Sequence, residues 1–143
     1  MDIYPLRIDY SVPLPVALHS ARLTDIDPSI TARAFPLPTR REQLRRLQIH
    51  YLERSSTALD VEAELAKHRQ DLANLWDLLA LIHRFELPPG LIVALGSRWF
   101  YPIGGNYSPF VHLGAGFREL RIVRTNRSFG PQCGFLAALK ETS

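Results

Sequence analysis

Residues 91–95 have the sequence LIVAL, and residues 133–140 have the sequence CGFLAALK. Each is a short apolar run beside Gly or Pro, which is the pattern of a buried β-strand. The segment between them is rich in Gly, Tyr, Asn, Ser and Arg, residue types that suit an adaptable binding surface. We therefore expect two framing strands late in the chain that hold a set of binding loops.

The totals of the sequence are those of an ordinary globular protein. Its 143 residues suffice for one domain with its own core, and 46% of them are hydrophobic. No apolar run approaches the ~20 residues of a membrane span, and the N-terminus lacks the features of a signal peptide. A single cysteine, Cys133, excludes an internal disulfide. We expect a protein without a membrane span that is cytoplasmic, or exported without a signal peptide.

Local patterns predict a mixed α+β fold with an N-terminal lobe over residues 1–87 and a loop-rich antiparallel β lobe over residues 88–143, packed as one globular unit. Helices are predicted near residues 56–68, which begin with hydroxyl caps, and 71–84, which show a clear 3.6-residue apolar period. Residues 39–54 fit either a helix or a half-buried strand. The shorter predicted elements are a strand at 7–12, a helix at 16–22, a helical turn at 29–33, strands at 91–95, 99–101, 110–113, 119–123 and 134–139, and turns at 104–106 and 114–116.

Several segments together resemble a group of uncharacterised small bacterial proteins. They are RIDYSVPL at 7–14, IT at 30–31, FP at 35–36, LWDLLAL at 75–81, IVALGSRW at 92–99, YSPF at 107–110, RELRI at 118–122 and CGFLA at 133–137. That group has a variable C-terminal segment between an IVALGSxW stretch and a CRFLAVRK stretch. The C-terminal part is also similar to the variable domains of diversity-generating retroelement targets, which have a C-type-lectin-like fold.

The resemblance implies a strand over residues 44–52 and a compact, C-type-lectin-like sheet over residues 91–140. It also implies that the loops of this sheet bind a partner, and that diversity in the loops sets which one. The chain departs from the group at Gly134 and Leu139, where the group has Arg, and at Phe129, where the last loop usually has Trp.

Candidate ligand-binding residues lie in and beside the C-terminal loops. Aromatic and Arg side chains are enriched at binding hot spots, although Tyr and Phe also fill the core of a small lobe. We predict that a protein or other macromolecular ligand is bound here, without metal or cofactor. The predicted residues are Arg98, Phe100, Tyr101, Asn106, Tyr107, His112, Asn126, Arg127 and Phe129.

A basic nucleic-acid-binding accessory protein is the alternative function. Residues 1–85 carry 11 Lys/Arg and 11 Asp/Glu, whereas residues 86–143 carry 6 and 3, so the whole net charge of +3 lies in the C-terminal part. A cationic surface of this kind attracts phosphates. The arginines that would form it are Arg40, Arg41, Arg45, Arg46, Arg121, Arg124 and Arg127.

No catalytic or metal-binding motif is visible. The five histidines lack the i, i+4 spacing of a zinc helix, and the C-terminal lobe offers only Glu119 and Glu141 as acids for calcium. A hydrolase or transferase that uses Cys133, with His112 as base, or Ser97 is the least favoured alternative. Nothing beside Cys133 indicates a lowered thiol pKa, and Ser97 lacks the second Gly of a nucleophile elbow. We therefore expect neither an enzyme nor a cofactor.

Overall fold

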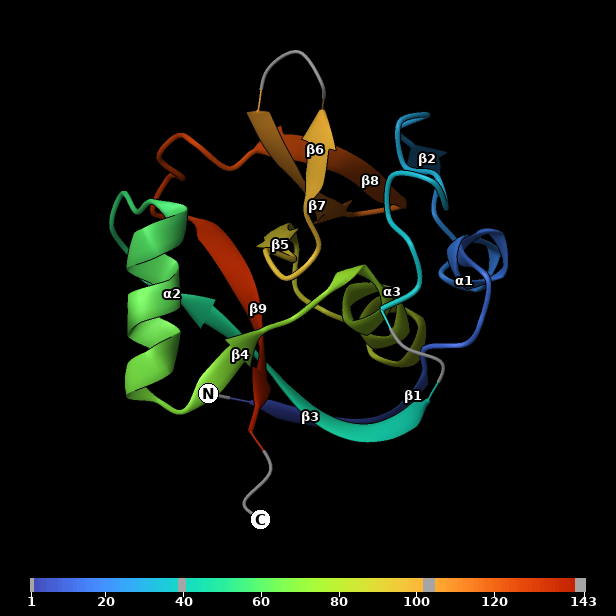
Figure 1. Ribbon diagram of the computed structural model, residues 1–143, viewed down its shortest axis with the longest axis horizontal. Helices are drawn as coiled ribbons and strands as arrows, with labels where there is room; N and C mark the ends of the chain where they lie inside the picture. The colour runs from blue at the N-terminus through green and yellow to red at the C-terminus, as the bar shows by residue number, and fades with distance from the viewer. Residues whose placement is uncertain (1, 39–40, 102–104, 141–143) are drawn as a thin grey trace.

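The computed structural model describes residues 2–38, 41–101 and 105–140. Within them, nine strands form one sheet and three helices pack against it, which confirms the mixed α+β prediction (Figure 1). The elements are β1 (Ile3–Asp9), α1 (Leu14–Ser20), β2 (Asp25–Ile26), β3 (Glu42–Tyr51), α2 (Ala58–Lys67), β4 (Gln70–Leu72), α3 (Leu75–Arg84), β5 (Gly90–Val93), β6 (Trp99–Tyr101), β7 (Gly105–Gly114), β8 (Phe117–Arg124) and β9 (Cys133–Leu139). The strand order is β1-β3-β9-β5-β7-β8-β2, with β4 also paired to β9 and β6 to β7.

The two predicted framing strands, β5 and β9, are adjacent in this sheet. They pair in parallel, with Leu91 opposite Cys133 and Val93 opposite Phe135. The prediction of an antiparallel C-terminal sheet is therefore wrong for this pair. Strand β2, which was not predicted, also pairs in parallel with β8, with Asp25 opposite Glu119. The reason is the path of the loop that connects β8 to β9. It returns to the end of the sheet where β5 begins, so β9 starts there and runs in the same direction as β5.

Alternate residues of each strand supply two separate cores on the two sides of the sheet. Ile92 and Leu136 belong to the larger core, which contains most of the buried side chains of α3. Their neighbours Val93 and Phe135 belong to the smaller core, together with Val61 of α2. We call these two sides the α3 face and the α2 face.

Hydrogen-bonded caps explain where α2 and α3 begin. Thr57 caps α2 and Asn74 caps α3, and each exchanges hydrogen bonds with an aspartate three residues later. The predicted helix at 56–68 is confirmed, but the one at 71–84 begins only at Leu75. Residues Gln70–Leu72 instead form β4, because they pair with β9 in the sheet.

The remaining N-terminal predictions are confirmed in part. Residues Glu42–Tyr51 form β3, which is the strand that the resemblance implied. The predicted strand at 7–12 lies over residues 3–9, and the predicted helix at 16–22 lies over residues 14–20, with Pro in its first turn. Residues 29–33 contain turns without a helix.

The C-terminal strands form where the sequence predicts them. The turn after Gly114 is confirmed, whereas the predicted turn at 104–106 falls partly outside the described residues, and Gly105 and Asn106 begin β7. The two predicted lobes share one sheet, since β3 and β4 pair with β9 and β2 pairs with β8. No helix in the described part of the chain is long and apolar enough to cross a membrane.

Candidate functional site

Helix α2 leaves part of its face of the sheet uncovered, over β5, β7 and β8. Val93, Phe110 and Arg121 are successive cross-strand neighbours, so their side chains point to this same face. Val93 is buried, whereas Phe110 is only half-buried. A groove of about 210 Å³ lies here, which we call the open groove. Its lining consists of Leu91, Val93, Phe110, Val123, Arg127, Ser128, Phe129, Gly130, Gln132 and Cys133.

The loop from β8 to β9, residues 125–132, forms one wall of the open groove. It crosses the α2 face from the end of β8 to the start of β9 (Figure 1). Hydrogen bonds hold it at both ends, from the Thr125 N–H to the Asn106 carbonyl at 2.9 Å and from the Cys133 N–H to the Gly130 carbonyl at 3.1 Å. In its middle, the main chains of Phe129 and Ser56 exchange two hydrogen bonds of 2.7 and 3.0 Å. The wall is therefore preorganised for binding.

Phe129 is the anchor of this loop, and it also lines the open groove. Its side chain is 4% exposed and meets the Phe135 ring edge-on, with 5.4 Å between ring centroids. Phe129 fixes the loop on the sheet because its apolar side chain packs into the core below. The neighbouring Asn126 and Arg127 are exposed, and Arg127 lines the open groove.

His112 lies on the same face as the open groove, whereas the side chain of Arg98 makes hydrogen bonds within the fold. His112 is an exposed cross-strand neighbour of Leu91 and of Glu119, with 3.8 Å between its Nδ1 and the carboxylate. Arg98 donates from Nη2 to Glu62 of α2 at 2.8 Å and from Nε to the Leu95 carbonyl at 3.1 Å. Arg98 thus joins α2 to the loop that follows β5.

The other predicted residues lie at the start of β7, away from the groove. Tyr107 has the opposite alternation from Phe110 and therefore faces the α3 side. Its hydroxyl accepts a hydrogen bond from Arg124 Nε at 3.1 Å, and its ring lies beside Trp99. The Asn106 carbonyl binds the crossing loop, as described above. The side chains of the two remaining predicted residues, Phe100 and Tyr101, lie outside the described part of the structure.

Cys133 and His112 do not form a nucleophile–base pair. They flank Leu91 on the two neighbouring strands and are therefore about 10 Å apart, two strand spacings. Burial raises the pKa of the Cys133 thiol, against smaller opposing effects of a Gly130 hydrogen bond and of Arg127. The thiol is therefore neutral near pH 7 and contributes apolar surface to the groove. Among the described residues, no group of three His, Cys, Asp or Glu could hold a metal ion.

The arginines of the predicted basic surface lie on separate parts of the molecule. Arg45 is on β3, and three strands separate it from Arg121 on β8. Arg45 pairs with the buried Asp77 at 3.4 Å, and Arg121 pairs with Asp25 at 2.6 Å and with Glu119 at 2.7 Å. Both charges are thereby compensated within the protein. Arg40 lies outside the described residues.

The floor of the open groove was not among the predicted site residues. Leu91, Val93, Phe110 and Val123 read from the sequence as ordinary positions of buried strands. One signal was available in the sequence. Glu119, Arg121 and Val123 are two residues apart along a strand, so one face of that strand carries both polar and apolar side chains. Only the strand order shows that the floor residues meet, and that α2 stops short of covering them.

Comparison of the chain with protein-family models, with curated proteins and with solved structures found no match.

Proposed function

We propose that this protein is a non-enzymatic recognition module with a C-type-lectin-like fold, which binds a protein ligand through the open groove. The observation that carries the proposal is the crossing loop, which is held at three places over a partly exposed apolar floor. A rigid wall beside an apolar floor is the arrangement that receives an anchor side chain of a partner. Two helices that precede a loop-rich sheet, and a last strand paired with β3, support the lectin-like part of the proposal.

The rim of the open groove supports a polypeptide ligand. Arg127 and Gln132 are exposed there and offer a cation and an amide, while His112 lies beside Phe110 on the same face. An apolar centre with a polar rim is typical of protein interfaces. The volume of about 210 Å³ suits one large side chain rather than a whole cofactor.

Sequence variation at the rim would change the ligand without disturbing the sheet. Asn126, Arg127, Ser128 and Gln132 are exposed, and the hydrogen bonds that hold the loop use main-chain atoms of other residues. We therefore propose these four positions as the ones at which diversity sets ligand choice.

The test is affinity capture with the purified protein, followed by expression of a captured protein and calorimetric measurement of its affinity. The variant Phe110→Ser, Arg127→Glu removes the floor and the rim cation together. We expect its affinity to fall at least tenfold, because an apolar anchor and a charge complement are both lost. Its melting temperature should fall by only a few degrees, since Phe110 is only partly buried and Arg127 is exposed.

The matched control is Leu44→Ser, Arg46→Glu on β3. Leu44 is 56% exposed, Arg46 is exposed, and neither lines the open groove. This control should bind the ligand as wild type does. Equal affinity in the groove variant and in the control would contradict the proposed site.

A further inference from the structure

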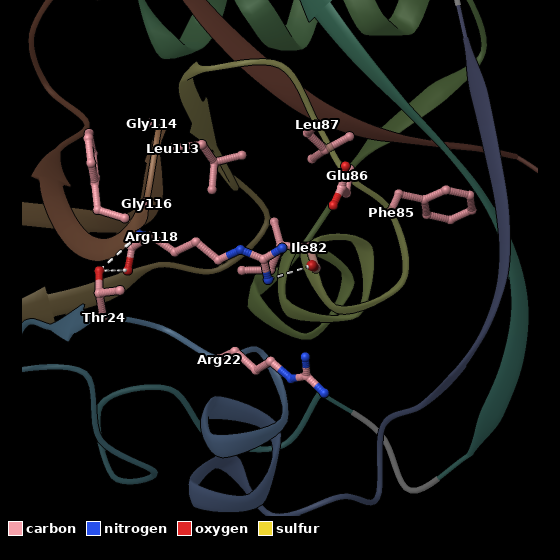
Figure 2. Close-up of a pocket in the computed structure, with 11 residues that line it drawn as sticks. Arg22, Thr24, Ile82, Phe85, Glu86, Leu87, Leu113, Gly114, Gly116 and Arg118 are labelled. Carbon is pink, nitrogen blue, oxygen red and sulfur yellow. Dashed lines mark hydrogen bonds between the residues drawn. The ribbon is translucent and has the colours of Figure 1, made fainter.

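A second pocket, of about 380 Å³, lies between the β7–β8 turn and the C-terminal end of α3 (Figure 2). It shares no lining residue with the open groove. The lining combines apolar side chains with two arginines and one glutamate. Its residues are Arg22, Thr24, Ile82, Phe85, Glu86, Leu87, Leu113, Gly114, Gly116, Phe117 and Arg118.

Arg118 lines this pocket, and only part of its guanidinium group is hydrogen-bonded within the protein. Its Nη1 donates to the Ala21 carbonyl at 3.0 Å and to the Ile82 carbonyl at 2.8 Å, which places it at the C-terminal ends of α1 and α3. Its Nη2 and Nε make no hydrogen bond to any described residue, and neither is among the buried atoms that lack a partner. Solvent therefore reaches these two donors, and they are available to a ligand.

Arg22 is held over the same pocket by an unusual backbone conformation. Its φ is +54°, in the left-handed region that non-glycine residues rarely adopt. Neighbouring contacts enforce it, because Thr24 exchanges hydrogen bonds of 2.8 to 2.9 Å with the main chain of Arg118. Strained residues of this kind persist where the surroundings over-determine them, often at ligand sites. In Figure 2, Arg22 lies below Arg118, and both residues line the pocket.

The two arginines of this pocket have no acidic partner among the described residues. By contrast, Arg45, Arg98 and Arg121 each form an ion pair of 2.6 to 3.4 Å with a carboxylate. A half-buried guanidinium with free donors matches the planar geometry of a carboxylate. The pocket therefore contains two guanidinium groups that form no ion pair with a described residue.

We propose that this pocket binds a small organic monocarboxylate with an apolar body. The carboxylate would accept hydrogen bonds from Arg118 and Arg22, and the body would lie against Leu87 and Phe117. Glu86 also lines the pocket, and its negative charge disfavours a dianion such as phosphate. The volume falls within the range of small-molecule sites.

The test uses 4-fluorophenylacetate as the probe, with ¹⁹F NMR titration of the full chain. Its neutral analogue 4-fluorophenylacetamide is titrated in parallel, inorganic phosphate is added as a competitor of the fluorinated probe, and protein amide resonances are followed in ¹H–¹⁵N spectra. We expect the carboxylate to bind at least tenfold more tightly than either, and to shift the amide resonances of Leu87, Gly114 and Gly116. Arg22→Gln should weaken the carboxylate about tenfold, with unchanged affinity for the neutral amide.

Arg33→Gln is the control, since Arg33 is exposed and does not line this pocket. It should bind the carboxylate as wild type does. Equal binding of carboxylate and amide, an unchanged affinity in folded Arg22→Gln, or no binding at millimolar probe would each overturn the proposal. Tighter binding of phosphate would overturn the assigned ligand class. The Arg22→Gln variant keeps the hydrogen bonds that Arg118 makes to the ends of α1 and α3, so we expect it to fold.

Discussion

Asp77 is a fully buried carboxylate in the first turn of α3. It accepts hydrogen bonds from the Tyr10 hydroxyl, from Arg45 at 3.4 Å and from the Asn74 N–H at 2.9 Å. Burial raises the pKa of Asp77 by favouring the neutral acid, and Arg45 is the strongest influence in the opposite direction. One residue thus caps a helix and also joins it to β3 and to the end of β1.

We predict that Asp77→Asn lowers the free energy of unfolding by roughly 3 kcal/mol, because it leaves the half-buried Arg45 without its counter-ion. Urea denaturation followed by circular dichroism measures this change. Glu42→Gln is the matched control, since it breaks an exposed pair with Arg7 at 3.2 Å. Its effect should stay below about 1 kcal/mol. Similar losses of unfolding free energy in both variants would show that burial does not determine how much an ion pair contributes to stability.

At the scale of elements, the short loop after β5 is hydrogen-bonded to the start of α3. The Gly96 N–H donates to the Ala73 carbonyl at 2.8 Å, and the Ser97 hydroxyl accepts from the Leu75 N–H at 2.8 Å, at the start of α3. A Cβ at Gly96 would lie 2.5 Å from the Ala73 carbonyl oxygen. The glycine of the LGSR stretch is therefore required for close packing of two main chains.

We predict that Gly96→Ala destabilises the protein by about 2 kcal/mol, since a main-chain segment must move to make room. Gly130→Ala is the control, because its Cβ would meet only the side chain of the exposed Gln132. That variant should lie within about 0.5 kcal/mol of wild type. Thermal and urea unfolding of both proteins give the comparison, and equal stabilities would refute the packing role of Gly96.

The packing of strand β9 shows why Gly134 leaves no room for a larger side chain. A Cβ at Gly134 would lie 2.7 Å from Ile49 Cγ2 and 2.9 Å from the Tyr51 ring. The side chains of β3 therefore occupy the space that an Arg at this position would need.

At the scale of the whole molecule, β9 unites the two predicted lobes. It pairs with β3 and β4 from the first 87 residues and with β5 from the rest. Its residues Phe135 and Leu136 supply the smaller and the larger core respectively. Neither predicted lobe therefore retains a complete sheet without the other.

We predict a single cooperative unfolding transition, and no stable fold for the separate segments 1–87 and 88–143. Trp76 in α3 and Trp99 in β6 report on the two parts, so variants that retain one Trp each should show coincident fluorescence and circular dichroism transitions. Two separated transitions, or dispersed amide resonances from the isolated 88–143 segment, would contradict this.

Much of the fold was predictable because its signals are local. Caps and apolar periodicity indicate α2 and α3, and short apolar runs beside Gly or Pro indicate β5 and β9. Periodicity left β3 ambiguous, and the implied strand came from the family resemblance alone. Of the predicted site residues, Arg127 and the largely buried Phe129 line the open groove and His112 lies beside it, whereas Tyr107 faces the other side.

By itself, then, the sequence determined which segments are helix or strand and which side chains alternate along each strand. Tertiary structure alone determined the parallel pairing of β5 with β9, the path of the loop across the sheet and the placement of Arg22 and Arg118 in the lining of one pocket. The physical reason is that the alternation of side chains along a strand is a local property of the sequence. The face of the sheet to which each side chain belongs exists only after distant strands have paired.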